Sequence, residues 1–386
     1  MYILLLTVFV DLVGFGIIFP ILPFYAVRYD ASPTEVTLLI ATYSVFQLIS
    51  GPIWGRLSDR FGRKWMLLAT LFGGGLSYLW FAYAGSLAAL FAARSLNGLM
   101  AGNIAVAQAY IADISEPSKR SAAMGKVGAA FGLGFVLGPL IGGLLSGSDP
   151  ANPDFSSPCL AAAGMSFAAC ILGAILLREP VRHDVSIAAL PGRTSALRSV
   201  LHGRVLWLFG LMFLLTFVMS QVIAIFPLWT GAVFQWGPRE IGYAYAFIGV
   251  LTFAFQGLLI GPITKAMGEG RVLCLGAALF SAGLFLVPWI DDLPMLALQM
   301  TLISIGMSLA NPTLTALVSQ SAAPAHQGMT LGVATSSSGA GRIIGPPVAG
   351  LLFQDIGINW PFLVGGVVML SLLAQSLALP RPDRPT

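Results

Sequence analysis

The sequence predicts an all-α polytopic membrane protein in which twelve transmembrane helices form two six-helix pseudo-repeats. The chain is 57% hydrophobic and 9% charged, whereas soluble domains are about 45–50% apolar and about 25% charged. Apolar runs long enough to cross a bilayer recur along the whole chain, without the alternation typical of membrane β-barrels. Short motifs of the first half also recur in the second. The basic residues fall at the ends of predicted helices, so the net charge of +4 does not indicate nucleic-acid binding.

The apolar runs define twelve spans, and their short connections make consecutive helices antiparallel neighbours. The first span begins at Met1 without a basic leader, and we interpret it as a retained helix. A long, arginine-rich connection divides the chain into an N-terminal six-helix bundle over 1–178, a cytoplasmic linker over 179–203 and a C-terminal six-helix bundle over 204–386. The spans are expected at about 1–27, 34–56, 64–84, 86–112, 120–147, 158–178, 204–232, 239–264, 271–290, 294–320, 327–353 and 360–379.

Lysine and arginine are distributed unevenly between the two sides of the predicted membrane. Sixteen of the twenty lie on the side that carries both termini and the central linker. Because basic loops stay in the cytoplasm, the positive-inside rule assigns this side to the cytoplasm. We therefore expect a multi-pass protein of a bacterial cytoplasmic (inner) membrane with both termini cytoplasmic.

The two halves share motifs at nearly one offset. Ile18-Phe19-Pro20 recurs as Ile225-Phe226-Pro227, and the glycine-proline motif of the fifth helix recurs loosely around Gly345-Pro346. Since each half has six helices, this is a parallel repeat. Two such halves enclose a cavity near the middle of the membrane and can rock around it. The repeat indicates a transporter; the alternative is chance similarity among Gly- and Pro-rich apolar segments.

The segment Gly55–Lys64 concentrates four cations and an aspartate between two apolar runs. Its pattern G-x-x-x-D-R-x-G-R-K resembles the signature loop between the second and third helices of the major facilitator superfamily of transporters. The resemblance implies a cytoplasmic latch in which Asp59 contacts the start of the eleventh helix near Gln327. The alternative is an ordinary basic loop with solvated charges. The predicted gate residues are Gly55, Asp59, Arg60, Gly62, Arg63, Asp113 and Arg120.

The predicted fifth helix carries the pattern G-x-x-x-G-P-x-x-G-G, formed by Gly134, Gly138, Pro139, Gly142 and Gly143. Small residues allow close helix approach where lipid supplies no hydrophobic drive for association, and the proline bends the helix. The pattern resembles the fifth-helix motif of the antiporter branches of the superfamily, which implies export. From physics alone it is a packing surface, and both interpretations can hold.

Asp11 is the only acid well inside a predicted span, about 15 Å into the first helix. A carboxylate at this depth costs about 2.5–3.5 kcal/mol on insertion scales and faces the bundle interior or water. Because low dielectric disfavours its charged form, Asp11 could load and release a proton near neutral pH. Its surroundings, through Phe15 to Pro23, resemble the first-helix pattern of drug:proton antiporters, particularly the tetracycline-efflux group. The alternative is a structural acid hydrogen-bonded to another helix.

Arg94 on the fourth helix is the cation expected to act with Asp11 in proton coupling. With Asn97 and Asn103 it forms R-x-x-N-G-x-x-x-G-N, which resembles the fourth-helix motif linked to proton transfer in the family. We expect deprotonated Asp11 to be attracted to Arg94 and protonated Asp11 to be released. Helix rise puts the two Cα atoms roughly 10 Å apart in depth, so Asn103 lies nearer the level of Asp11. The alternative is a buried cation satisfied by helix carbonyls.

The resemblance implies a substrate cavity lined by the first, fourth, seventh and tenth helices. Aromatic and methionine side chains with few hydrogen-bonding groups suit hydrophobic, adaptable ligands better than sugars or phosphates. Arg342 could neutralise an anionic substrate or hold its helix to a neighbour. The predicted cavity residues, each of which could instead belong to the core, are Phe15, Asn97, Asn103, Gln221, Phe226, Trp229, Met307, Asn311 and Arg342.

Two departures from the tetracycline-efflux group bear on the substrate. Phe280 stands where that group carries an acid in the ninth helix, and Thr252 stands where it carries a histidine in the eighth. The sequence therefore argues against tetracycline, and against a metal chelate generally, as the substrate.

The primary hypothesis is a secondary active transporter that exports hydrophobic or amphipathic drugs or related small molecules in exchange for protons by a rocker-switch mechanism. The alternative is a proton-coupled or facilitative metabolite transporter of the same fold, either an importer or a uniporter. A membrane enzyme is not expected, because the spans contain neither a metal-ligand cluster nor a Ser/His pair. We expect no cofactor and no metal, the proton gradient as energy source, and a monomer whose partners are its substrate, protons and the lipid bilayer.

Overall fold

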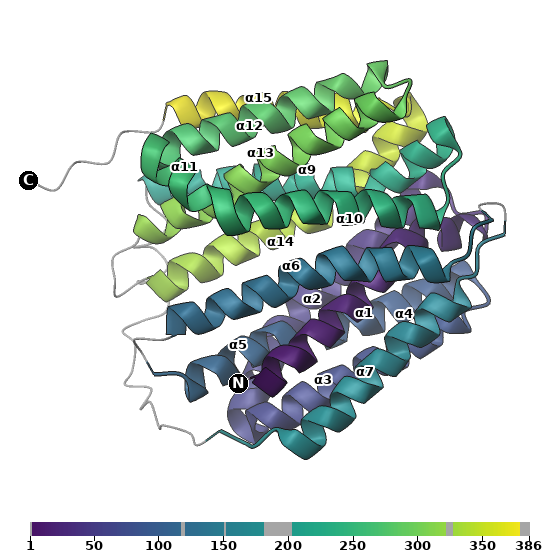
Figure 1. Ribbon diagram of the computed structural model, residues 1–386, viewed down its shortest axis with the longest axis vertical. Helices are drawn as coiled ribbons and strands as arrows, with labels where there is room; N and C mark the ends of the chain where they lie inside the picture. The colour runs from purple at the N-terminus through teal and green to yellow at the C-terminus, as the bar shows by residue number, and fades with distance from the viewer. Residues whose placement is uncertain (1, 117–119, 150–151, 181–202, 322–326, 379–386) are drawn as a thin grey trace, which may run out of the picture. The chain divides into compact units, whose positions relative to one another are not determined.

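The computed structural model of the protein describes residues 2–116, 120–149, 152–180, 203–321 and 327–378, and the regular elements among them are helical (Figure 1). Long helices are joined by short connections, as expected for a polytopic membrane protein. The α-helices in chain order are α1 (Tyr2–Val27), α2 (Pro33–Phe61), α3 (Arg63–Ala82), α4 (Leu87–Met100), α5 (Asn103–Ile114), α6 (Arg120–Leu145), α7 (Ser156–Leu176), α9 (Gly203–Phe234), α10 (Pro238–Ala254), α11 (Ile260–Met267), α12 (Glu269–Leu286), α13 (Leu293–Gln320), α14 (Gln327–Leu351) and α15 (Trp360–Leu377).

Ten helical segments of the described chain are long and apolar enough to cross a membrane. One of them, Pro238–Met267, joins α10 to α11 through a π-helical turn at Phe255–Leu259. The other two predicted spans correspond to the pair α4–α5 and to α14. The predicted all-α polytopic architecture is confirmed.

Two details of the predicted layout are wrong. The signature segment was expected to be a turn, but α2 continues through it to Phe61 and α3 begins at Arg63, so Gly62 alone separates the two helices. The fourth span was expected to be one helix over 86–112, but it breaks at Ala101 and Gly102. Glycine tolerates the backbone conformation of Gly62, whose φ is +108°, and this explains the first position.

Side chains of α2 satisfy the backbone at the break between α4 and α5. Ser50 Oγ donates to the carbonyl of Gly98 over 3.1 Å, and Trp54 Nε1 donates to the carbonyl of Leu99 over 2.6 Å. A Cβ on Gly102 would lie 2.7 Å from the Trp54 Cβ, so only glycine fits there. Free carbonyls are costly at membrane depth, so these hydrogen bonds from α2 stabilise the interruption that precedes Asn103.

The described residues fall into two compact units, each considered by itself. The first comprises the described parts of 1–186 together with 224–250, and the second the described parts of 187–223 and 251–386. The segment 224–250 thus groups with helices of the first half of the chain. The boundaries expected for the two six-helix bundles and their linker stay a prediction.

In the first unit, α1 and α6 approach backbone to backbone through the predicted glycine motif. A Cβ on Gly138 would lie 2.6 Å from the Gly16 Cα, and one on Gly134 would lie 2.8 Å from the Leu12 Cβ. A Cβ on Gly142 would meet the backbone of Ile17, only 2.9 Å from its carbonyl carbon. The motif is therefore a packing surface, as the physical argument predicts.

A neighbouring face of α6 reaches α10. A Cβ on Gly143 would lie 3.0 Å from the Gly242 Cα, and one on Gly242 would lie 2.6 Å from the carbonyl oxygen of Pro139. Adjacent glycines of α6 thus serve different neighbours, since Gly142 faces α1 and Gly143 faces α10. In the second unit, α12 and α13 pack in a comparable way, with Gly276 and Gly306 against each other's helices.

Candidate functional site

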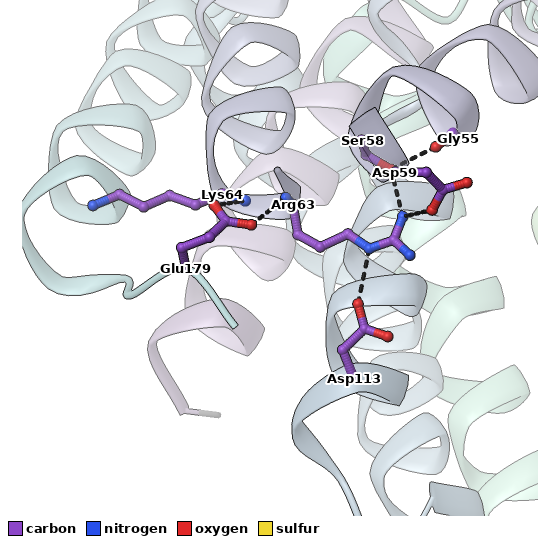
Figure 2. A network of polar contacts seen from close by, with 7 residues as sticks. All are labelled: Gly55, Ser58, Asp59, Arg63, Lys64, Asp113 and Glu179. Atoms are coloured by element: carbon purple, nitrogen blue, oxygen red, sulfur yellow. Dashed lines mark hydrogen bonds and ion pairs between the residues drawn. The ribbon is translucent and has the colours of Figure 1, made fainter. Parts of the chain in front are cut away.

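The junction of α2 and α3 carries a network centred on Arg63 (Figure 2). Its Nη1 atom lies 2.6 Å from the Asp59 carboxylate, and its Nε atom lies 2.9 Å from the carboxylate of Asp113 on α5. The same Nη1 donates to Ser58 Oγ over 2.6 Å, and Ser58 Oγ donates to the carbonyl of Gly55 over 2.7 Å. One guanidinium therefore bridges the end of α2 and the end of α5.

The backbone of the same junction is held by Glu179, just beyond α7. Its carboxylate accepts from the N–H of Arg63 over 2.5 Å and from the N–H of Lys64 over 3.1 Å (Figure 2). Lys64 Nζ in turn donates to the carbonyl of Ala174 over 2.8 Å, in the last turn of α7. The start of α3 and the end of α7, which lie side by side, are thus capped by each other's charges.

Gly62 makes this arrangement possible. Its φ of +108° is a conformation that side-chain-bearing residues rarely adopt, and a Cβ there would lie 2.9 Å from the carboxyl atoms of Glu179. Gly55 differs, because a Cβ there would meet nothing within 4 Å. The backbone conformation in this structure therefore favours glycine at the second glycine of the pattern, Gly62, and not at the first.

The remaining predicted gate residues lie apart from the network. Arg60 is exposed, with its guanidinium 5.3 Å from the centre of the Phe61 ring. Arg120 begins α6, and its side chain lies outside the described part of the structure. The expected contact of Asp59 with the helix that starts at Gln327 would join the two units, and it stays a prediction.

A cavity of about 550 Å³ opens beside Glu179, at the ends of α5 and α7. The hydroxyl of Tyr110 on α5 donates a hydrogen bond to the backbone carbonyl of Arg178, which connects α5 to the segment that follows α7. The cavity is lined by Ile3, Tyr110, Ile114, Ser115, Glu116, Leu176, Leu177, Arg178, Glu179 and Pro180.

Asp11 lies in the middle of α1 and is hydrogen-bonded by the side-chain amide of Asn103 on α5. The Asn103 oxygen accepts from the N–H of Ile104 over 2.7 Å, which fixes the amide with its nitrogen toward the carboxylate. A Cβ on Gly74 of α3 would lie 3.9 Å from Asp11 Oδ1, so a small residue leaves room on that side. The expectation that Asn103 lies near the level of Asp11 is confirmed.

Arg94 is buried, with 1% of its surface exposed, and its guanidinium lies among aromatic rings. The guanidinium carbon is 4.6 Å from the centre of the Tyr43 ring and 5.7 Å from that of Phe15. Its Nε and Nη1 atoms have no hydrogen-bond partner, and within the described part of the chain Arg94 forms no ion pair. Asp11 and Arg94 are therefore not paired in this structure, and cation–π contacts are what stabilises the buried charge.

Sequence reasoning missed Tyr78 on α3, which is 3% exposed and lies near both Asp11 and Arg94. A Cβ on Gly14 would lie 3.4 Å from its ring. Next to it, Ser77 Oγ accepts from Asn97 Nδ2 over 2.9 Å. The only signal in the sequence was a run of three glycines, Gly73 to Gly75, on the third helix.

Several predicted cavity residues of the first unit belong to an aromatic row. The ring centre of Phe15 lies 6.2 Å from that of Phe135, and that of Phe19 lies 5.6 Å from that of Tyr245. Tyr245 continues the row to Phe226 at 6.0 Å. Phe226 and Trp229 are buried at 3% and 2% exposure, so both fill the core of this unit.

The predicted cavity residues of the second unit have diverse surroundings. Gln221 is fully buried, its Nε2 donates to the carbonyl of Pro361 over 2.8 Å, and its Oε1 has no partner. Met307 and Asn311 are half-buried on α13, and Arg342 is exposed on α14. Their predicted contact with a substrate is not tested by this arrangement.

No group of three or more His, Cys, Asp or Glu side chains in the described ranges has the geometry to hold a metal ion. Cys159, Cys170 and Cys274 are free thiols.

The chain is similar to known proteins over nearly its whole length. A sequence profile of the Major Facilitator Superfamily matches residues 4–259 and 234–386. The chain is 31% identical to "Multidrug resistance protein 2" of Bacillus subtilis (strain 168), over 95% of this chain and 92% of the relative. It is 30% identical to "Tetracycline resistance protein, class C" of Escherichia coli, over 95% of this chain and 93% of the relative. The structure of the nucleoside transporter NupG superposes with a TM-score of 0.81 at 15% identity, over 98% of both chains, and shows the same fold.

Proposed function

Since the chain belongs to the Major Facilitator Superfamily, we propose that it exports hydrophobic or amphipathic drugs in exchange for protons by rocker-switch alternating access. As a member of this family it is a membrane transporter and not an enzyme. Relatives named for multidrug and tetracycline resistance support the efflux of small drug-like molecules. The proton gradient supplies the energy without a cofactor, and the working unit is a monomer in the cytoplasmic membrane of a bacterium.

The observation that carries the proposal is the state of Asp11. Its carboxylate lies inside a membrane span and is hydrogen-bonded by a neutral amide, that of Asn103, while the nearest buried cation, Arg94, forms no ion pair in the described structure. A buried carboxylate without a cation partner favours its protonated form, whereas pairing with a cation favours the charged form. Movement of Asp11 between Asn103 and Arg94 would therefore bind and release one proton in each cycle.

The α2–α3 junction supports a gate on the cytoplasmic side. Arg63 holds Asp59 and Asp113 together, so the ends of α2 and α5 move as one body. A latch works when such a body makes a contact in one state that it lacks in the other. In this proposal Asp59, which is 63% exposed, supplies that contact.

Phe280 supports a substrate other than tetracycline. The side chain is 1% exposed on α12, and a Cβ on Gly306 of α13 would lie 2.6 Å from the Phe280 backbone nitrogen. No acid is available at this place to bind a metal chelate, and packed helices fill the space. The half-buried rings of the aromatic row, Phe15, Phe19 and Phe135, favour planar, apolar molecules instead.

Reconstitution tests exchange directly. Proteoliposomes with an acidic lumen and an internal pH dye receive ethidium, rhodamine 6G or tetracycline on the outside. Exchange predicts that uptake of ethidium or rhodamine 6G raises the internal pH, and that tetracycline does so weakly or not at all. Proton exchange would be contradicted if ethidium or rhodamine 6G entered without any change in the lumen pH and at a rate that does not depend on the pH gradient.

The second candidate is a proton-coupled carrier of an anionic metabolite, and unpaired Arg94 is the observation that favours it. An anion bound at the free Nε and Nη1 atoms would add a negative charge near Asp11 and so favour its protonated form, because Arg94 and Asp11 both lie near Tyr78. Anion and proton would then bind together, which is symport and not exchange. In the same assay an impermeant organic anion such as benzenesulfonate would then carry protons with it, so the pH change has the opposite sign.

A further inference from the structure

The first turn of α3 receives its cap from a distant part of the chain. The first N–H groups of a helix have no partner within it, and a side chain at the N-cap normally accepts one of them. Here the N-cap is Gly62, which has no side chain and no side-chain cap. Glu179 accepts the N–H groups of Arg63 and Lys64 with its two carboxylate oxygens (Figure 2).

The capping pair also works in the opposite direction. Lys64 Nζ donates to the carbonyl of Ala174, so a cation lies at the end of α7 as Glu179 lies at the start of α3. Gly62 leaves no room between the helix start and Glu179, because a Cβ would lie 2.9 Å from that carboxylate. The position of Glu179 is therefore set by two hydrogen bonds to the start of α3.

Arg63 connects this cap to the predicted gate. Its N–H group is held by Glu179, while its guanidinium reaches Asp59 and Asp113. A change in the first turn of α3 moves the Cα of Arg63, and with it both ion pairs. Glu179 touches neither acid, so any effect that it has on the gate passes through Arg63.

We propose that Glu179 is a positioning residue of the cytoplasmic gate, which holds Arg63 in place so that its guanidinium can bridge α2 and α5. This inference rests on the gate in the proposed function and not on the identity of the substrate. It also gives a role to the point where the chain leaves the first half, which the sequence placed in an unstructured linker.

The test measures gate opening without substrate or proton gradient. Spin labels replace Lys126 on α6 and Arg271 on α12, in protein whose three native cysteines are replaced, and their distance distribution reports the cytoplasmic opening in nanodiscs. Glu179→Gln keeps the size of the side chain but loses its charge, so we expect the ratio of open to closed populations to rise about fivefold. The matched control is Glu116→Gln, since Glu116 lines the same cavity, whereas Glu179 is the acid that accepts the N–H groups of Arg63 and Lys64.

Chemical rescue separates positioning from fold stability. In Glu179→Ala, sodium formate can occupy the vacated place at the start of α3, because helix N-termini bind small anions. We expect formate to restore the wild-type populations of the open and closed states, and chloride at the same ionic strength to restore them less. The unfolding temperatures of Glu179→Gln and Glu179→Ala should stay near that of wild type. Unchanged populations in both variants would overturn the proposal, as would an equal shift in Glu116→Gln or a shift that formate does not reverse.

The readout also distinguishes this proposal from the proposed function. If none of the tested compounds exchanges for protons, the spin-label populations still report on Glu179. If exchange is found but the populations do not respond, the drug-export proposal stands and the positioning role fails.

Discussion

Two clusters of charged residues in the first unit differ in whether their charges form ion pairs. At the α2–α3 junction Arg63 lies between two carboxylates, and a third, that of Glu179, holds its backbone. Inside the predicted membrane Asp11 is bound by a neutral amide, and Arg94 lies between two rings with two nitrogen atoms unpartnered. The cluster nearer to water is fully paired, whereas the buried one is not.

This difference indicates different tasks. Paired ions near the surface are screened and contribute modestly to stability, but their geometry can hold helix ends in register. An unpaired buried charge is costly, and such charges inside membranes are usually tied to transport. We infer that the first cluster fixes structure and the second changes its charge state during the cycle.

Asp11→Asn should have the largest effect, because it removes the group that changes charge. We expect drug-induced proton movement to fall by about 100-fold or more, which corresponds to about 3 kcal/mol, while the protein stays folded. The measurement is the internal pH of proteoliposomes after ethidium addition. Asp11→Glu, which keeps a titratable group, should retain part of the response.

An unchanged pH response in Asp11→Asn would remove the distinction between the clusters. The variant would then show that Asp11 has a structural role, because an asparagine at this position could also form a hydrogen bond with Asn103. Thermal unfolding of both Asp11 variants serves as the control, since a loss of fold would also stop transport.

A matched pair of arginine variants tests the comparison next. Arg94→Gln removes an unpaired buried charge, so its unfolding temperature should stay constant or rise although transport falls about tenfold or more. Arg63→Gln leaves Asp113 without its cation, and it should lower the free energy of unfolding by about 1–2 kcal/mol. Both quantities are measured on the same purified variants. A strong loss of stability in Arg94→Gln alone would reverse the assignment of the two clusters.

The sequence predicted the order of the long helices well, because most of them coincide with an apolar run and end near charged or turn-forming residues. It also brought Asp11 close to Asn103, since helix rise fixes depth along the membrane. Contacts across the bundle depend on helix rotation, and the sequence does not specify rotation. For this reason Tyr78 was missed, and the cation–π contacts of Arg94 with Tyr43 were not expected.

The break between α4 and α5 and the cap at Glu179 show a second limit. The sequence predicted one unbroken helix here, because Ser50 and Trp54, which donate hydrogen bonds to the backbone at the break, lie on another helix. Glu179 lies 116 positions from Arg63 in the sequence. Its neighbours suggested a loose linker, and only the approach of α3 to α7 shows what the carboxylate does.

A pair of glycine variants probes the paired cluster at its backbone. Gly62→Ala forces a side chain into φ +108° and against Glu179, so we expect a loss of about 1–3 kcal/mol in the free energy of unfolding. Gly55→Ala lies within α2 in open space and should be neutral or stabilising by up to about 1 kcal/mol. Denaturant titration of both variants in one detergent checks this. Equal effects would mean that the positive φ of Gly62 carries no structural demand.

The smallest expected effect separates the two acids that share Arg63. Asp59 is 63% exposed and Asp113 is 31% exposed, so water screens the first ion pair more than the second. Asp59→Asn should therefore change the free energy of unfolding by less than about 0.5 kcal/mol, and Asp113→Asn by about 1 kcal/mol. Transport should show the opposite order, because in the proposed gate Asp59 makes the contact that differs between states. If Asp113→Asn instead impairs transport more than Asp59→Asn, then the latch depends on the bridge between α2 and α5, and the exposed acid has no separate role.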